Sequence, residues 1–298
     1  MELRQLEYFV AIVETGSFSQ AAKRCNVAQP SLSQQIIKLE NELGCQLFDR
    51  LGRSIAVTEV GRVFYPRARS ILSDLQQATY AITTGYSPQE GSLKVGIIPT
   101  LGPYLLYRTV QRFNQAYPEA ELQIYEDMTE DLIGKLLNAE LDLAFMSLPI
   151  DNKQITTQVL FTEPLYVVIP ASHAMASEET IDASILGELP FIRLSEQNCL
   201  TDQLDAFCYL QKIDPPTICY TTQLTTVMEF VRLGIGVSLV PACLASLYVG
   251  DDLVFKRITV NSPDRVIVAA RHHGRAESVL GKAFSLFLQE VWREIVRE

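Results

Sequence analysis

The sequence predicts an α/β protein with a small helical head that carries a two-stranded wing, one long linker helix and a larger α/β domain. Three observations predict this arrangement. Apolar residues repeat with helical spacing over the first 43 residues, a heptad-like pattern follows from about residue 58 to 84, and strand and helix patterns alternate from residue 91 onward. With 298 residues, 48% of them hydrophobic, the chain is long enough to form two sizeable cores.

Charge is unevenly distributed along the chain. The net charge of −10 argues against a uniformly basic nucleic-acid coat or a polybasic membrane binder. Residues 23–69 nevertheless carry a net charge of +4, which leaves −14 for the rest. The first residues, MELRQLEYF, include three charges and no continuous apolar run. We therefore expect no secretory signal, no membrane contact and a cytoplasmic location.

The six cysteines predict reduced thiols rather than a disulfide framework, because the cytoplasm keeps ordinary thiols reduced. The three histidines lack metal-ligand spacing with any cysteine. We expect neither a metal nor a cofactor.

The head is predicted to hold a helix-turn-helix. An apolar stripe with i, i+3, i+4, i+7 spacing marks a first helix that ends near Gly16, and residues 17–20 fit the capping box of a short second helix. A third helix spans residues 28–44, with Pro30 in its first turn and Gly44 suited to end it in the left-handed region. Its buried stripe consists of Leu32, Ile36, Leu39 and Leu43.

The exposed face of this third helix is the candidate DNA-reading surface. Short hydrogen-bonding side chains near a helix N-terminus can reach base edges in a major groove, while a lysine favours phosphate. Residues 47–50 and 55–58 are predicted to pair as a wing whose arginines lie against the DNA backbone. The alternative for the helix face alone is ordinary solvation. The candidate DNA-binding residues are Gln29, Pro30, Ser31, Ser33, Gln34, Lys38, Arg50 and Arg53.

One long helix is predicted from Thr58, a suitable N-cap, to about Thr84, bent near its start by Pro66. We interpret it as a dimerising linker, because DNA-reading heads commonly work as two-fold pairs. The alternative is a helix packed on its own domain. The spacing between its apolar residues alternates between four and three positions, as in a coiled-coil seam. These residues are Phe64, Ala68, Ile71, Leu75, Ala78 and Ile82.

The segments AQPSLSQQIIKLENELGCQLFDR and SIAVTEVGRVFYPRAR resemble the winged helix-turn-helix and linker of LysR-type transcriptional regulators. The resemblance implies a DNA-binding domain over residues 1–58, a linker and dimerisation helix over 59–86, and an effector domain over 91–298. It also implies a homodimer or homotetramer that binds promoter DNA, with RNA polymerase as a partner.

After a turn-rich break at residues 85–92, strand candidates alternate with helical segments at 102–116, 129–139 and 223–233. Such alternation predicts parallel sheets with ligands near the carboxyl ends of strands. LysR effector domains resemble periplasmic binding proteins, which implies one lobe over 91–163 plus 266–298 and another over 164–265. The strand candidates are 93–99, 121–126, 141–147, 164–170, 190–194, 217–222, 236–241 and 266–270.

The segment NCLTDQLDAFC (198–208), together with GIIPTLGPYLL, EDMTEDL and GIGVSLVPA, resembles the peroxide-sensing OxyR branch of this family. The resemblance implies that Cys199 reacts with hydrogen peroxide and that Cys208 is its disulfide partner. It also implies a polar pocket that includes Thr100, Thr129 and Asp202.

Helix geometry predicts how such a pair would switch. A cysteine at the mouth of a helix over residues 200–209 is favoured as thiolate, which attacks peroxide and becomes a sulfenic acid. Nine residues of unbroken helix span about 13.5 Å and turn about 900°, whereas a disulfide needs α-carbons within about 7 Å. Disulfide formation must therefore unwind this segment, which we expect to change how effector domains pair.

Two positions depart from the branch. Asn198 and Thr201 stand where these sensors commonly carry histidine and arginine. Asn198 can donate a hydrogen bond to a thiolate or to peroxide but carries no charge, and Arg265 is a candidate distant cation for Cys199.

Three functions follow from these patterns. The first is a redox-responsive LysR-type regulator. The second is a LysR-type regulator gated by a small organic effector in the inter-lobe cleft, with Cys199 and Cys208 as reduced, buried thiols. The third is a thiol peroxidase with an incidental DNA head. We favour the first, and hence a regulator rather than an enzyme.

Overall fold

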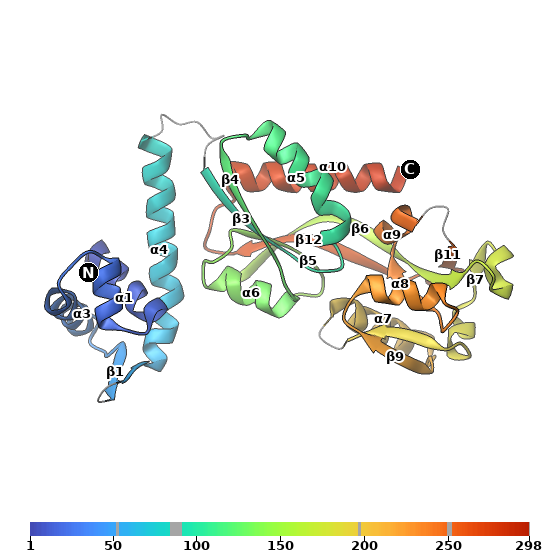
Figure 1. Cartoon of the computed structure of the whole chain (residues 1–298), viewed down its shortest axis with the longest axis horizontal. Coiled ribbons are helices and arrows are strands. Elements are labelled where there is room, and N and C mark those ends of the chain that lie inside the picture. Colours follow the sequence, from blue (N-terminus) through green and yellow to red (C-terminus); the bar gives the residue numbers. More distant parts are fainter. Residues whose placement is uncertain (52–53, 84–90, 196–197, 249–251, 298) are drawn as a thin grey trace. The chain divides into compact units, whose positions relative to one another are not determined.

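A computed structural model describes residues 1–51, 54–83, 91–195, 198–248 and 252–297 (Figure 1). The chain divides into two compact units. One consists of Met1–Gly91 with Leu137–Glu140, and the other of Ser92–Leu136 with Leu141–Glu298. Each unit has its own hydrophobic core.

The N-terminal unit begins with three short helices, α1 (Leu3–Thr15), α2 (Phe18–Arg24) and α3 (Gln29–Leu43). The hydroxyl of Ser17 accepts a hydrogen bond from the Gln20 backbone N–H at 3.4 Å, so half of the predicted capping box is present. Pro30 lies in the first turn of α3, and Gly44 ends it with φ of 69°, as predicted. The buried side chains of α1, α2 and α3 form one core with Phe48 of the wing.

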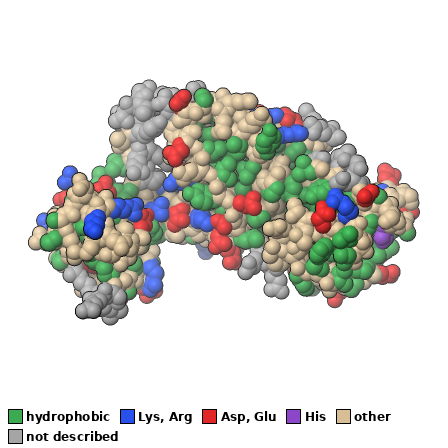
Figure 2. All heavy atoms as spheres, in the orientation of Figure 1, with side chains coloured by type: hydrophobic (Ala, Val, Ile, Leu, Met, Phe, Trp, Pro, Cys, Tyr) green, Lys and Arg blue, Asp and Glu red, His purple; other side chains and the backbone are tan. Residues whose placement is uncertain are grey.

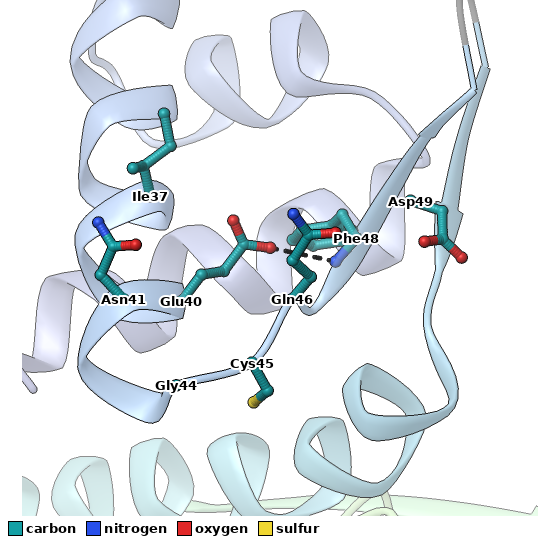
Figure 3. Close-up of a pocket in the computed structure, with 8 residues that line it drawn as sticks. All are labelled: Ile37, Glu40, Asn41, Gly44, Cys45, Gln46, Phe48 and Asp49. Carbon is teal, nitrogen blue, oxygen red and sulfur yellow. Dashed lines mark hydrogen bonds between the residues drawn. The ribbon is translucent and has the colours of Figure 1, made fainter.

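The wing consists of strands β1 (Phe48–Leu51) and β2 (Ser54–Val57), which pair antiparallel. Glu40 of α3 fixes the entry to this wing, because its carboxylate accepts the backbone N–H of Leu47 at 2.8 Å. It also accepts the backbone N–H of Phe48 at 3.2 Å (Figure 3). Two otherwise unpaired N–H groups are thereby satisfied at the turn between α3 and β1.

Helix α4 (Glu59–Thr83) follows the wing. Thr58 caps it by accepting the Gly61 N–H at 3.0 Å, as predicted. Phe64 and Ala68 pack on the core of the head, whereas Ile71 and Leu75 are exposed in the single chain. The side chains of Ala78 and Ile82, which complete the predicted seam, lie outside the described residues.

The C-terminal unit is built on a mixed sheet in the order β4-β3-β5-β12-β6-β11-β7, with β10 paired to β6 and a separate pair β8-β9. The strands are β3 (Gly91–Ile97), β4 (Ala120–Glu126), β5 (Leu143–Ser147), β6 (Ile155–Pro170), β7 (Thr180–Ile181), β8 (Phe191–Leu194), β9 (Thr217–Thr221), β10 (Ser238–Pro241), β11 (Leu253–Ile258) and β12 (Asp264–His272).

The prediction of parallel sheets is wrong for the strands that pair with β6 and for β12 with β5. β3 with β5, β8 with β9 and β11 with β7 are parallel, but β12 runs antiparallel to both β5 and β6, and β10 and β11 run antiparallel to β6. The reason is that the chain runs along the unit in β6 and returns in the opposite direction in β12, which pairs with β6 (Figure 1).

Helices cover this framework. α5 packs beside the C-terminal α10, where Phe113 and Phe284 lie 5.4 Å apart between ring centroids (Figure 1). No described helix is both long and apolar enough to cross a membrane. The helices are α5 (Gly102–Ala116), α6 (Thr129–Leu137), α7 (Cys199–Gln211), α8 (Leu224–Arg232), α9 (Ala242–Ala245) and α10 (Val279–Arg297).

Candidate functional site

Cys199 is the first residue of α7, directly after strand β8 and its loop. The helix begins here because the buried Asn198 caps it, its side-chain oxygen accepting the Leu200 N–H at 3.0 Å. The Thr201 hydroxyl donates to the carbonyls of Leu194 and Ser195, both at 3.1 Å, which ties the first turn to the end of β8. The capping role of Asn198 was not part of the sequence prediction.

Two threonines from other helix beginnings reach the same thiol. Thr129 is the first residue of α6, and the buried Thr100 lies two residues before α5. Both hydroxyls lie close enough to the Cys199 sulfur to lower the pKa of its thiol. The Thr129 hydroxyl is buried without a partner of full hydrogen-bond geometry among the described residues, so it is available to a small polar ligand.

Arg265 of β12 is the cation of this site. Its Nη1 donates to the Thr100 hydroxyl at 2.7 Å and its Nη2 to the Thr100 carbonyl at 3.1 Å. Its Nε donates at 2.7 Å to Glu163, the register partner of Arg265 on β6, and both side chains are fully buried. Burial works to lower the pKa of Arg265, but the Glu163 charge raises it, and the guanidinium stays charged.

Sequence analysis missed Glu163 and Cys243 as members of this network. The second oxygen of the Glu163 carboxylate accepts the backbone N–H of Cys243 at 2.8 Å. Burial raises the pKa of the Cys243 thiol well above its usual value, and the neighbouring Glu163 charge raises it further. Cys243 is therefore a protonated thiol in a polar network rather than simple apolar packing.

The environment of Cys199 contains opposing electrostatic effects. Burial raises the pKa of its half-buried thiol, and the Asp202 charge raises it further. The Arg265 charge and the two threonine hydroxyls lower this pKa. The net result is a pKa above the usual value of a cysteine. Asp202 is exposed, and its own pKa is raised by partial burial and by Asp205 and Glu130.

Cys208 lies near the other end of the same helix, buried at 5% exposure. Burial raises the pKa of its thiol to about 11, the Arg193 charge lowers it, and Asp205 and Asp214 raise it. Both cysteines are free thiols on one unbroken helix, so their α-carbons are about 13.5 Å apart along its axis.

Gln203, midway between the two cysteines, ties α7 to the end of β5. Its amide nitrogen donates to the Ser147 hydroxyl at 2.5 Å and to the Leu148 carbonyl at 3.1 Å. Its amide oxygen is buried without a hydrogen-bond partner among the described residues. No local sequence pattern predicts this contact, because the two residues are 56 positions apart in the chain.

The candidate DNA-reading residues lie together at the beginning and on the outer face of α3. Gln29, Pro30, Ser31, Gln34 and Lys38 are exposed and Ser33 is half-buried. Lys and Arg side chains gather on the visible face of this unit (Figure 2). Arg53 and the side chain of Arg50 lie outside the described residues. Within the described ranges, no group of three or more His, Cys, Asp or Glu side chains has the arrangement of a metal site.

A helix-turn-helix with a wing, joined by a long helix to an α/β domain with a polar thiol site, defines a DNA-binding regulator with its own sensor domain. The family model of bacterial regulatory helix-turn-helix proteins of the lysR family matches residues 3–62, and the LysR substrate binding domain matches residues 87–293. The chain belongs to the LysR family of transcriptional regulators, and several of its relatives are OxyR proteins.

Three similar proteins illustrate the relationship. The DNA-binding transcriptional dual regulator OxyR of Escherichia coli K12 is 34% identical over 242 residues, 81% of this chain and 79% of that protein. Full-length OxyR from Pseudomonas aeruginosa, with a cysteine-to-aspartate substitution, has a TM-score of 0.79 at 29% identity and covers 97% and 98% of the two chains. A cysteine-to-serine mutant of Corynebacterium glutamicum OxyR, bound to H2O2, has a TM-score of 0.67 at 30% identity and covers 99% and 94%.

Proposed function

We propose that this regulator senses hydrogen peroxide through a Cys199–Cys208 thiol/disulfide switch. The observation that supports it best is the set of groups around one thiol: Cys199 begins a helix, faces the hydroxyls of Thr100 and Thr129, and lies within the field of the buried Arg265. Its relatives include proteins named as hydrogen peroxide-inducible genes activators and an OxyR structure with H2O2 bound.

The chemistry has two steps. The Cys199 thiolate attacks one peroxide oxygen, the O–O bond breaks, and the products are a sulfenic acid and hydroxide. The Cys208 thiolate then attacks the Cys199 sulfur, the S–S bond forms, and the S–O bond breaks to release a second hydroxide. The protons of the two thiols convert both hydroxides to water, so two electrons pass from the sulfurs to the peroxide.

The raised pKa of Cys199 is consistent with a sensor whose reduced form is stable at low peroxide concentration. Arg265 and the threonine hydroxyls stabilise the small thiolate population that reacts, and the Thr129 hydroxyl has capacity for a bound peroxide. Neutral Asn198 holds the helix beginning and supplies no charge, so Arg265 is the cation of the pocket.

Disulfide formation requires α7 to unwind, because the helix holds the two sulfurs too far apart. This unwinding and refolding of residues 199–208 is the conformational switch. We propose that it repositions effector domains in a homodimer or homotetramer bound to promoter DNA in the cytoplasm, and that the oligomer contacts RNA polymerase from there. The domain limits of this proposal are 1–58, 59–86 and 91–298, with lobes of 91–163 plus 266–298 and of 164–265.

Mass spectrometry after stoichiometric hydrogen peroxide tests the proposal. A Cys199–Cys208 linkage, with loss of two hydrogens, is the expected product. A Cys208→Ser variant should stop at a Cys199 sulfenic acid that a 1,3-dione reagent traps. Free thiols that persist at high peroxide would exclude the mechanism.

The raised pKa of Cys199 also favours a second candidate, gating by a small organic effector that uses the unpartnered polar atoms of Thr129 and Gln203. Thermal stabilisation by a metabolite, together with an unchanged DNA response in Cys199→Ser, would support this candidate over the redox switch. Repeated peroxide turnover with a thiol reductant, without a change in DNA binding, would instead indicate a peroxidase.

A further inference from the structure

Arg193 lies on strand β8, next to the helix that the redox switch must unwind. One guanidinium nitrogen, Nη1, forms an ion pair with Asp205 of α7, and the arginine side chain is only 12% exposed. Its Nε is buried and has no hydrogen-bond partner among the described residues. A buried N–H donor without an acceptor is costly, so an acceptor that reaches it in another state of the protein would be stabilised there.

Cys208 is a fitting acceptor. It lies one turn beyond Asp205 on α7, and the Arg193 charge acts on its sulfur. The other charged groups that act on Cys208 are Asp205 and Asp214, which are both acidic and oppose formation of a thiolate. In the reduced protein, Asp205 therefore pairs with the cation that acts on this thiol.

We propose that Arg193 assists the second, disulfide-forming step by exchanging Asp205 for the Cys208 thiolate when α7 unwinds. This inference rests on the proposed peroxide-sensing function and concerns how that site completes its reaction. Arg193 belongs to a strand that pairs with β9, whereas Asp205 and Cys208 belong to the segment that rearranges. Unwinding removes Asp205 from the guanidinium, and the released positive charge and free Nε then stabilise the thiolate that attacks the Cys199 sulfenic acid.

Disulfide formation from the Cys199 sulfenic acid and the Cys208 thiolate needs no further reagent. Peroxide has already oxidised Cys199 to the sulfenic acid, so the attacking Cys208 thiolate forms the S–S bond and expels hydroxide, which takes up the proton that Cys208 lost. Arg193 itself takes no part in the proton transfer.

Three substitutions in the full-length protein separate this role from simple support of the helix. Arg193→Gln removes the charge, Arg193→Lys keeps it, and Asp205→Asn breaks the same ion pair from the other side. For each, the rate of Cys199 sulfenic acid formation is measured in a Cys208→Ser background by 1,3-dione trapping. The rate of disulfide formation is measured with both cysteines present, by mass spectrometry of quenched samples across a pH series.

The expected result is opposite effects of the two charge-removing variants. A pKa increase of one unit reduces the thiolate population about tenfold, and the greater nucleophilicity of the more basic thiolate recovers about threefold, so Arg193→Gln should slow disulfide formation about threefold or more. Arg193→Lys should restore it, Asp205→Asn should accelerate it, and sulfenic acid formation should stay within about twofold throughout. Arg232→Gln, which removes an arginine paired with Glu229 inside α8, is the matched control.

Each other result counts against the inference. If Arg193→Gln and Asp205→Asn change disulfide formation in the same direction, the ion pair only supports the helix and the exchange is wrong. If the first step slows as much as the second, Arg193 acts on the whole fold. If the unmodified protein forms a sulfenic acid but no disulfide, or neither product, the proposed switch fails, and the role of Arg193 fails with it.

Discussion

The guanidinium of Arg265 donates to the hydroxyl of Thr100 across 2.7 Å, although 165 residues separate them in the sequence. Both side chains are buried, and both act on the Cys199 thiol. Thr129 acts on the same thiol but has no comparable partner among the described residues. The two threonines thus differ in their hydrogen-bond partners. Thr100 links the thiol to the buried Arg265–Glu163 ion pair, whereas the Thr129 hydroxyl has no hydrogen-bond partner among the described residues.

This difference predicts separable effects of the two threonines. Thr129→Val should slow the reaction of Cys199 with peroxide while changing the free energy of unfolding by less than about 1 kcal/mol, because no hydrogen bond of full geometry is lost. Thr100→Val should slow the same step and also cost about 1–3 kcal/mol, because it leaves a buried guanidinium N–H unsatisfied. Stopped-flow peroxide kinetics and urea unfolding measure both quantities. Equal stability losses would show that the Thr129 hydroxyl is already engaged.

The raised pKa of Cys208 predicts a loss of stability in alkali. Because the folded thiol titrates at about 11, above the unfolded value, the native protein keeps a proton that the unfolded chain has already released. The unfolded state then binds fewer protons, so the free energy of unfolding falls as pH rises from about 8.5 towards 11. In Cys208→Ala, the slope of the free energy of unfolding against pH should correspond to about one proton fewer. Urea unfolding at a series of pH values measures this slope. An unchanged slope would contradict burial of this thiol.

Local patterns in the sequence were sufficient for much of the site. Pro30 and Gly44 marked the ends of α3. The thiol pair and its threonines were predicted from the resemblance of residues 198–208, and of the segments that contain Thr100 and Thr129, to the OxyR branch. Strand β6 was predicted only from residue 164, because Pro164 lies in its middle and a proline argues against the interior of a strand. The strand in fact extends from Ile155 to Pro170.

The partners of the site were harder to predict for a different reason. Glu163 and Arg265 meet because β6 and β12 pair in one register, and that register depends on the whole sheet rather than on either segment. The same holds for Gln203 and Ser147. Motifs identify groups that react, whereas the groups that hold them are set by long-range packing.

Gln203 should restrain α7 in the reduced state. Gln203→Ala removes two hydrogen bonds to β5 and its connecting residue, a loss of about 1–2 kcal/mol from the reduced form alone. The disulfide should then become harder to reduce, with a potential more negative by about 20–40 mV in a glutathione redox titration. Gln211→Ala, at the end of the same helix, is the matched control. A potential that moves in the positive direction would mean that Gln203 supports the oxidised form.

Substitutions at two exposed positions of α3 should weaken DNA binding in different ways, one in base preference and the other in affinity for all sequences. Gln34→Ala should relax base preference at one position of the operator by about 1–3 kcal/mol, because an amide reads a base edge. Lys38→Ala should weaken binding to all sequences alike and reduce the salt slope by about one, because a lysine contacts phosphate. Binding titrations on an operator library at several salt concentrations distinguish the two, and Glu42→Ala on the same helix serves as a control for its folding. If both variants lost affinity uniformly, with the same change in salt slope, Gln34 would also be a backbone contact, and sequence reading would have to reside in Ser31, Ser33 or the beginning of the helix.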